Sequence, residues 1–300
     1  MTDRPDFPKS IDSSARKAFA SCPMLFYYEY MLHLKPKGVN INLHFGGCFA
    51  RGLEIVRKEF YGKKSTFEHS IAKGTEALLK AWGDFEPEGE TKKTLDACID
   101  CLYDYFVQYP PADDPVKPLI IDGEPTVEFS FAIPIPDSKH PQTGEPILYT
   151  GRFDMMAEYN GAVFIDDEKT AAQLGKSWMN SQRMASQYTG YIWAAKSFGY
   201  EVMGGVIRGI SPLKRGVNQV MLLIYRPNWM IERWLWQLNR DIARMIDCWE
   251  SGEWDYNIDA ACGNYGGCSF LEVCEDKNPS GLLSLEYEVN LWDPLEKSDD

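Results

Sequence analysis

The dipeptide Asn160-Gly161 is the feature of this sequence that most constrains its fold. It divides a run of alternating apolar residues, YTGRFDMMAEY and then AVFIDDEKT, between residues 149 and 170. Asn-Gly favours a type I′ turn, which is the two-residue connection of a β-hairpin. With a two-residue loop, pairing continues outward from the turn one residue at a time. The register therefore predicts that Asp154 lies opposite Asp167 on adjacent strands.

Two carboxylates that face each other across a hairpin repel, since directly opposed side chains lie only about 5 Å apart. The alternation of side chains along a strand places Lys169 on the same face as Asp167. A hard cation such as Mg²⁺ between the carboxylates would compensate their charge, and the lysine would orient or deprotonate a water or stabilise charge on phosphorus. The alternative is a surface hairpin in which Asp167 only pairs with Lys169. The apolar AVFI before the charges favours a site at the end of a buried strand.

The remaining periodicity predicts helices, then strands with interleaved helices, then a long helix. The predicted helices cover residues 12–34, 47–61, 66–83, 91–108, 175–183, 185–198 and 228–250. The further predicted strands cover residues 124–135, 201–210 and 218–226. This order predicts an α/β fold in which a central mixed β-sheet is flanked by helices.

The domain boundaries follow from the same pattern. We expect a single domain over residues 1–278, with a mainly helical part at 12–110, an α/β core at 120–250 and a Cys-rich loop at 259–276. An acidic, solvated tail is expected at 279–300.

Composition limits the function classes. The net charge of −13 argues against a protein that coats nucleic acid by bulk charge alone. A local basic track is a possible substitute, and an ordinary charged helix face is the alternative; its members would be Lys35, Lys37, Arg51, Arg57, Lys58, Lys63 and Lys64. No apolar run reaches the roughly 18 residues of a membrane span, and no signal peptide is visible, so we expect a cytoplasmic protein without membrane contact.

The chain contains eight cysteines, which are poor disulfide candidates in a reducing compartment. Cys262, Cys268 and Cys274 are regularly spaced in CGNYGGCSFLEVC, and thiolates in fours hold iron–sulfur clusters or zinc. The short spacings of a zinc knuckle are missing from this segment. Cys98 and Cys101 fall on an apparent helix, where a role in the core is expected; Cys48 and Cys248 also have the pattern of packing residues.

Several motifs resemble those of the PD-(D/E)XK nuclease superfamily. GRFD and DEKT, which contain Asp154 and Asp167, resemble its split acidic signature, and more closely the G-x-x-D and D-x-K-T pattern of the RecB-type exonuclease branch, which includes CRISPR-associated and AddB-like nuclease domains. QYTGY resembles the Q-x-x-x-Y motif of that branch, and SCPMLFYYEY and FGGCFARGLE resemble its first two helices. The matches extend from residue 14 to residue 274. The resemblance implies a restriction-endonuclease-like fold.

The resemblance also implies roles for particular residues. Asp154 and Asp167, with the backbone carbonyl of Glu168, would hold Mg²⁺ or Mn²⁺, and Lys169 would activate the attacking water. Glu128 corresponds to a strand glutamate near the site, and Glu54 could face the same cleft as a further metal ligand. Gln187 and Tyr191 would position the DNA backbone; the alternative is a hydrogen-bonded pair on a helix surface.

One position departs from the family pattern. Relatives place a metal-binding histidine four residues after the glycine that corresponds to Gly46, and this chain has Ala50 there. A site with oxygen ligands alone suits Mg²⁺ and accepts Mn²⁺.

Members of this branch that carry an iron–sulfur cluster use one N-terminal cysteine and three C-terminal ones. The resemblance therefore implies a [4Fe-4S] cluster held by Cys22, Cys262, Cys268 and Cys274. Such a cluster would fasten the N-terminal helix to the C-terminal Cys-rich loop.

The function expected from these features is metal-dependent hydrolysis of DNA phosphodiester bonds. The chain would be an exonuclease on single strands or DNA ends in recombination, repair or phage replication, with a helicase or recombination protein as a possible partner. A non-catalytic DNA-end-binding or assembly subunit of a recombination or CRISPR adaptation complex is the alternative. An electron-transfer iron–sulfur protein is a third, and the complete acidic hairpin argues against it.

Overall fold

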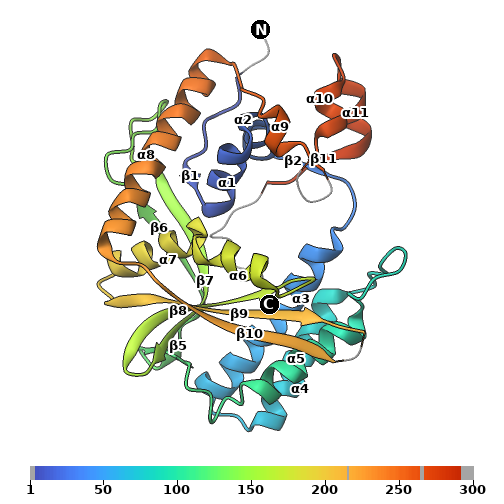
Figure 1. The fold of residues 1–300 in the computed structure, drawn as a ribbon, viewed down its shortest axis with the longest axis vertical. Helices are drawn as coiled ribbons and strands as arrows, with labels where there is room; N and C mark the ends of the chain where they lie inside the picture. The colour runs from blue at the N-terminus through green and yellow to red at the C-terminus, as the bar shows by residue number, and fades with distance from the viewer. Residues whose placement is uncertain (1–3, 215, 264–266, 292–300) are drawn as a thin grey trace. The chain divides into compact units, whose positions relative to one another are not determined.

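The computed structural model describes residues 4–214, 216–263 and 267–291 (Figure 1). The chain contacts divide it into two compact units, each assembled from separate segments. Unit 1 comprises Met1–Gly38, Ser130–Gly151 and Asn228–Asp300, and unit 2 comprises Val39–Phe129 and Arg152–Pro227. The expectation of a single domain over residues 1–278 stays a prediction. In the described part of the chain, no helix is long and apolar enough to cross a membrane.

Unit 2 is built on a mixed sheet. Its main strands are, in spatial order, β7 (Leu148–Tyr159), β8 (Ala162–Thr170), β9 (Val202–Pro212) and β10 (Val217–Tyr225). β8 and β9 are parallel, and the other two pairings are antiparallel. The shorter strands are β3 (Lys117–Pro118) and β6 (Val127–Pro134), which also pair with β7, and β4 (Ile120–Ile121) and β5 (Glu124–Pro125), which pair with each other. The predicted mixed sheet is confirmed.

The hairpin between β7 and β8 has the predicted register. Asn160 and Gly161 both have positive φ, at 51° and 76°, as a type I′ turn requires. Pairing runs from Tyr159↔Ala162 outward to Met155↔Asp166. The regular ladder ends there, one pair before Asp154 and Asp167.

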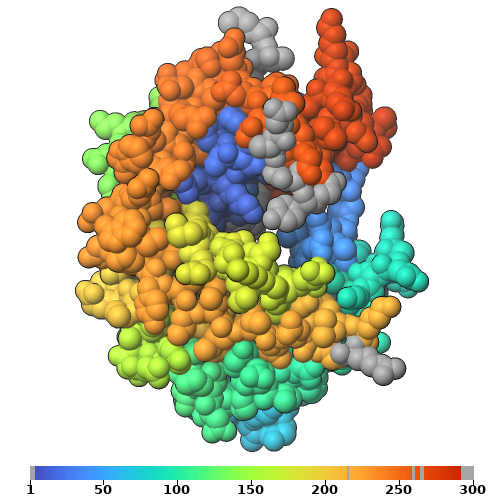
Figure 2. Space-filling model, viewed as in Figure 1, coloured from blue at the N-terminus to red at the C-terminus, as the bar shows by residue number. Residues whose placement is uncertain are grey.

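Helices cover both faces of this sheet (Figure 1). Ile210 of β9 belongs to a core cluster with the first group of helices, α3 (Ile41–Arg57), α4 (Phe67–Trp82) and α5 (Leu95–Gln108). Ile207, three residues earlier on β9 and so on the opposite face, packs with Tyr188 of α7 (Ser186–Ser197). The short α6 (Lys176–Arg183) has no buried residue and lies on the surface of the molecule (yellow-green in Figure 2).

The helices begin at side chains that cap them. Asn40 accepts hydrogen bonds from the first turn of α3, Thr66 from α4 and Thr94 from α5. α3 continues into a π-helical turn, η2 (Lys58–Gly62). The core assignment of Cys98 and Cys101 is confirmed, since both are fully buried on α5.

Unit 1 consists mainly of helices. They are α1 (Ser13–Ser21), α2 (Pro23–Phe26), the π-helical η1 (Tyr27–Met31), α8 (Asn228–Ser251), α9 (Ile258–Ala261), α10 (Leu271–Glu275) and α11 (Ser280–Glu286). Its strands are β1 (Ser10–Ile11), which pairs in parallel with the start of β7, and β2 (Leu34–Pro36) with β11 (Tyr287–Val289). The predicted long amphipathic helix is confirmed as α8, whose apolar face is buried.

Two predicted boundaries change in unit 1. The helix expected over residues 12–34 is interrupted at Cys22, whose backbone is extended (φ −160°), because a following proline disfavours the helical conformation. Part of the expected acidic tail forms α11 and β11. Leu282, Leu283 and Tyr287 explain this, since they pack on an aromatic cluster that contains Tyr28 and Phe270.

Candidate functional site

Unit 2 contains a cleft of about 440 Å³ at the end of β8. It is bordered by α3, the segment before α5, β6, β7 and β8. The predicted site residues that line it are Glu54, Glu128, Asp154, Glu168 and Lys169. Segments far apart in the sequence therefore bring most of the predicted acidic residues to one cavity.

Asp154 lines this cleft, whereas Asp167 does not belong to its described lining. Asp154 is half-buried, and its Oδ2 accepts a hydrogen bond from the backbone N–H of Glu168 at 3.0 Å, where the β7–β8 ladder has ended. Asp167 is fully buried. Lys169 Nζ lies 2.9 Å from its Oδ1 and 2.7 Å from its Oδ2, and Tyr188 donates to Oδ2 at 3.3 Å.

Burial raises the pKa of both carboxylates. Burial raises the pKa of Asp154 well above its usual range, and the charge of Asp167 raises it further, while Lys169 opposes both. Burial also raises the pKa of Asp167 against the influence of Lys169. For Lys169, burial acts to lower the pKa, but Asp167 and Asp154 outweigh it and raise the pKa well above the usual value. The lysine is therefore a cation at neutral pH.

Glu128 extends the acidic group from β6. Its φ is +53°, an uncommon left-handed conformation for a residue with a side chain. Arg152 Nε lies 2.7 Å from its Oε2. Burial raises the pKa of Glu128 to about 7; Arg152 lowers it, and the charges of Glu54 and Glu168 raise it. Arg152 therefore offsets only part of the effect that burial and the neighbouring carboxylates have on Glu128.

Glu54 lines the cleft but is already paired. Arg51 Nη1 lies 2.7 Å from its Oε2, and Lys58 binds its Oε1. Burial would raise the pKa of Glu54, but these two cations lower it below the usual value. Ala50 also lines the cleft, one helical turn before Glu54, at the position where the family pattern has histidine.

Gln187 and Tyr191 form the hydrogen-bonded helix pair. The Nε2 of Gln187 donates to the Tyr191 hydroxyl at 3.0 Å. Neither residue belongs to the described lining of the cleft. Burial, and then the charge of Asp167, raise the pKa of the Tyr191 hydroxyl.

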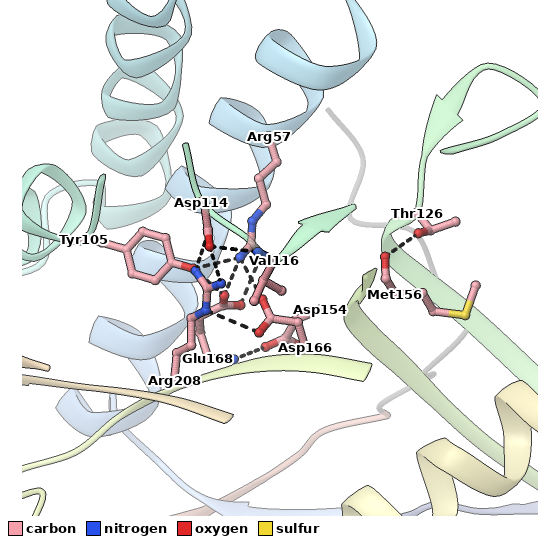
Figure 3. A network of polar contacts seen from close by, with 10 residues as sticks. All are labelled: Arg57, Tyr105, Asp114, Val116, Thr126, Asp154, Met156, Asp166, Glu168 and Arg208. Carbon is pink, nitrogen blue, oxygen red and sulfur yellow. Dashed lines mark hydrogen bonds and ion pairs between the residues drawn. The ribbon is translucent and has the colours of Figure 1, made fainter. Parts of the chain in front are cut away.

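A buried ionic network that the sequence analysis did not predict lies beside this site (Figure 3). It consists of two guanidinium groups, three carboxylates and one phenol. Its members are Arg57, Tyr105, Asp114, Asp166, Glu168 and Arg208. Asp166 and Glu168 alternate on β8 with Asp167 and Lys169, and so belong to the other face of the strand.

The contacts of this network pair each arginine with a carboxylate. Arg208 makes two hydrogen bonds to Asp114, at 2.7 and 3.0 Å, and Arg57 binds both oxygens of Glu168. The Tyr105 hydroxyl connects the two halves, since it accepts from both arginines at 2.9 Å and donates to Glu168 at 2.7 Å. Arg57 lowers the pKa of Glu168 to about 2 against the effect of burial.

The four candidate cluster cysteines all belong to unit 1. Cys22 is buried, and Cys262, Cys268 and Cys274 are half-buried. Burial, followed by the charges of Cys268, Cys22 and Cys262, raises the pKa of Cys274 to about 11. The N–H of Cys268 donates to the carbonyl of Cys262 at 2.9 Å. Residues 264–266 of the predicted loop lie outside the described residues.

The chemistry of the acidic group suits a hard divalent cation. Burial and then the charge of Asp167 raise the pKa of Asp154 beside a cavity. Mg²⁺ is commonly held by one or two carboxylates, with waters or phosphates completing its shell. A group of three or more His, Cys, Asp or Glu side chains arranged to hold a metal ion does not occur among the described residues.

Most of the predicted basic track is neutralised within the chain. Arg51 and Lys58 pair with Glu54, Lys63 pairs with Glu59, and Arg57 belongs to the buried network. In unit 1, Lys35 pairs with Glu288 and Lys37 donates to backbone carbonyls. These pairings favour the interpretation of an ordinary charged surface.

Comparison with known proteins identifies the family. The family model described as PD-(D/E)XK nuclease superfamily matches residues 13–275. No curated protein matches the sequence. Two solved structures are similar to the chain: a candidate exonuclease from Eubacterium rectale (13% identity, 92% of each chain, TM-score 0.49) and the protein SSO0001 (14% identity, 87% of this chain and 93% of the other, TM-score 0.31). These structural similarities are too weak to support a functional argument. The family match spans most of the sequence, and the chain belongs to the PD-(D/E)XK nuclease superfamily.

Proposed function

We propose that this protein is a divalent-metal-dependent DNA exonuclease of the RecB type that hydrolyses phosphodiester bonds in single strands or at DNA ends. The observation that carries the proposal is the group of Asp154, Asp167 and Lys169 beside a cleft, in a chain of nuclease family. Recombination, repair or phage replication would be its setting, with a helicase or recombination protein as partner.

The metal would be held by Asp154, Asp167 and the backbone carbonyl of Glu168, with Glu128 nearby. Mg²⁺ or Mn²⁺, when bound, supplies Lewis-acid stabilisation of the phosphoryl oxygens. The raised pKa values of Asp154 and Glu128 support this assignment, because a bound cation would stabilise the charged carboxylates against burial and against the neighbouring negative charges.

The protein's own groups would divide the remaining work. Lys169 stays protonated, so it would orient the attacking water or donate to a phosphoryl oxygen rather than remove a proton. Glu128 has a pKa of about 7, which suits a group that accepts a proton from water near neutral pH. Gln187 and Tyr191 would position the DNA backbone, and for this they would exchange their mutual hydrogen bond for contacts with DNA.

Cleavage of end-labelled single strands in Mg²⁺ or Mn²⁺ tests the proposal. Asp154→Ala should lower the rate by at least about a hundredfold, the size of effect typical for loss of one electrostatic group at a reacting centre. Glu158→Ala is the matched control, because Glu158 is an exposed acid on the same strand. Products released one nucleotide at a time would indicate an exonuclease. Equal residual cleavage by wild type and Asp154→Ala would refute the enzyme assignment.

A non-catalytic DNA-end-binding subunit is the second candidate, and Ala50 is the observation that favours it. A protein of this kind would bind DNA ends without cleaving them. The labelled-strand assay combined with a binding assay separates the two functions, because only the second candidate gives binding without products.

We also propose that Cys22, Cys262, Cys268 and Cys274 hold a [4Fe-4S] cluster with a structural role. Its support is that all four cysteines belong to unit 1 and that the backbone of Cys268 is hydrogen-bonded to that of Cys262. The purified protein should be brown and contain iron, and Cys268→Ala should lose the iron and melt at a lower temperature. Cys248→Ala, at a half-buried cysteine outside this set, should retain the iron. Absence of iron from anaerobically purified wild type would refute the cluster.

A further inference from the structure

Lys93 is a buried cation in the cleft that has no acidic partner. Its exposure is 8%, and it lies immediately before Thr94, the cap of α5. Its Nζ donates to Asn42 Oδ1 at 2.8 Å and lies 5.6 Å from the centre of the Phe45 ring. No carboxylate of the described residues is within ion-pair distance of it.

This isolation distinguishes Lys93 from the other cations at the cleft. Lys169 is paired with Asp167, Arg152 with Glu128, and Arg57 with Glu168. An ammonium group that is removed from water without a counter-ion costs several kcal/mol. Burial accordingly lowers the pKa of Lys93, and no carboxylate opposes the shift.

Small residues of α3 form the wall of the cleft next to Lys93. Gly46, Gly47 and Ala50 of α3 line it together with Asn42. A Cβ added at Gly47 would meet no atom within 4 Å, so the backbone of α3 faces open space there. The backbone N–H of Lys93 donates to Thr91 Oγ1 at 3.1 Å, which holds the segment in place. An extended chain could therefore approach the ammonium group closely.

We propose that Lys93 binds a backbone phosphate of the nucleic-acid strand other than the one that is cleaved. The inference rests on the proposed nuclease function and adds a substrate contact to it. Lys93 lines the same cleft as Asp154 and Lys169, so a strand whose scissile phosphate meets those residues passes Lys93. The neighbouring phosphate supplies the negative charge that the protein does not.

The first test measures binding of a fluorescein-labelled oligothymidylate in Ca²⁺, as a function of salt concentration. Loss of one phosphate contact should reduce the slope of log K against log [salt] by about 0.7. Lys93→Met should show this change and bind about tenfold more weakly, the size expected for one charged hydrogen bond. Lys93→Arg should restore most of the affinity. Lys92→Met is the matched control: Lys92 is the exposed neighbour outside the cleft, and its slope should equal that of wild type.

The second test locates the contact on the strand. Oligonucleotides that carry one neutral methylphosphonate at successive positions should bind wild type more weakly at one position near the cleaved bond. Lys93→Met should be insensitive to the substitution at that position alone. A variant that remains sensitive at every position would overturn the proposal.

Stability separates a binding role from a structural one. Because the ammonium is buried without a counter-ion, Lys93→Met should melt at the same temperature as wild type or higher, while binding DNA more weakly. A folded Lys93→Met protein with unchanged affinity and slope would overturn the proposal, and so would a variant that melts lower and is not rescued by arginine. If wild type binds DNA without cleaving it, the enzyme assignment fails while this contact is still measured.

Discussion

The buried network and the acidic cleft contain adjacent residues of the same strand, β8, but these residues have different roles. Asp166 and Glu168 meet two arginines on one face of β8, and each of their charges is offset nearby. Asp167 and Lys169, which alternate with them, form an ion pair next to Asp154, and Asp154 and Lys169 line the cleft. The comparison teaches that acidic residues alone do not mark a site in this protein. The distinguishing feature of the second group is that Glu128, Asp154 and Lys169 line a cavity.

The difference also separates stability from function. Removing one partner of a buried ion pair leaves an uncompensated charge and is strongly destabilising. Removing a carboxylate from a group that already repels itself has the opposite tendency. Substitutions in the two regions should therefore change stability with opposite sign.

The largest expected effect on folding comes from Arg208. This side chain is fully buried, and Arg208→Met would leave Asp114 without its cation and Asp166 with Arg57 alone. We expect a loss of about 3–5 kcal/mol in the free energy of unfolding, measured by urea denaturation with tryptophan fluorescence. Arg152→Met is the control, since Arg152 makes an ion pair while exposed to solvent, and its loss should stay below about 1 kcal/mol. Equal losses from both variants would remove the distinction between the two regions.

An intermediate effect should come from Glu128 and depend on pH. Its pKa in the folded protein is about 7, against an ordinary 4.5, so the folded state holds the proton more tightly than the unfolded state. The contribution of Glu128 to the free energy of unfolding should therefore be largest below pH 4.5. It should decrease as the pH rises from 4.5 through 7. At about 1.4 kcal/mol per pKa unit, the full contribution is about 3 kcal/mol.

Melting temperatures at pH 5 and pH 8 without divalent cations test this expectation. Glu128→Gln should lose less stability between the two values than wild type, and Mg²⁺ should raise the melting temperature of wild type more at pH 8 than at pH 5. Glu158→Gln, on the exposed side of β7, should behave as wild type does. If the melting temperature of Glu128→Gln changes with pH as that of wild type does, the charge of Glu128 does not destabilise the folded protein.

The smallest effect is expected at the edge of the cleft. Lys58 pairs with Glu54 while its side chain is 45% exposed, and such pairs contribute about 0.5 kcal/mol or less. Lys58→Met should therefore change the urea midpoint only slightly. A loss comparable with that of Arg208→Met would mean that the cleft depends on its ion pairs as the network does.

The sequence predicts the hairpin well because its signals are local. The turn needs only Asn160 and Gly161, and the register follows from the turn by counting. The long helix α8 was equally accessible, since its apolar spacing repeats over many turns. The interruption of the first helix at Cys22 was not predicted, although Pro23 is a signal for it. The apolar and aromatic residues on both sides continue the helical pattern across this position.

The buried network was missed because its partners are distant in sequence. Arg57, Asp114 and Asp166 come together only through the packing of α3, the segment after α5, and β8. One signal could have indicated it. Arg208 interrupts the apolar strand GGVIRGI, and a charged residue in the middle of a buried strand requires a partner. Which acid supplies that partner is decided by tertiary structure alone.

The division into units has a consequence for synthesis on the ribosome. Unit 2 ends at Pro227, whereas unit 1 needs the segment that begins at Asn228. The nascent chain therefore contains all of unit 2 before the segment from Asn228 onward, with which residues 1–38 form unit 1, has been synthesised. Domains usually mature from the N-terminus during translation. Here the amino-terminal residues would be among the last to fold. A chain that is truncated after Pro227 would contain the residues of the cleft but would lack Cys262, Cys268 and Cys274.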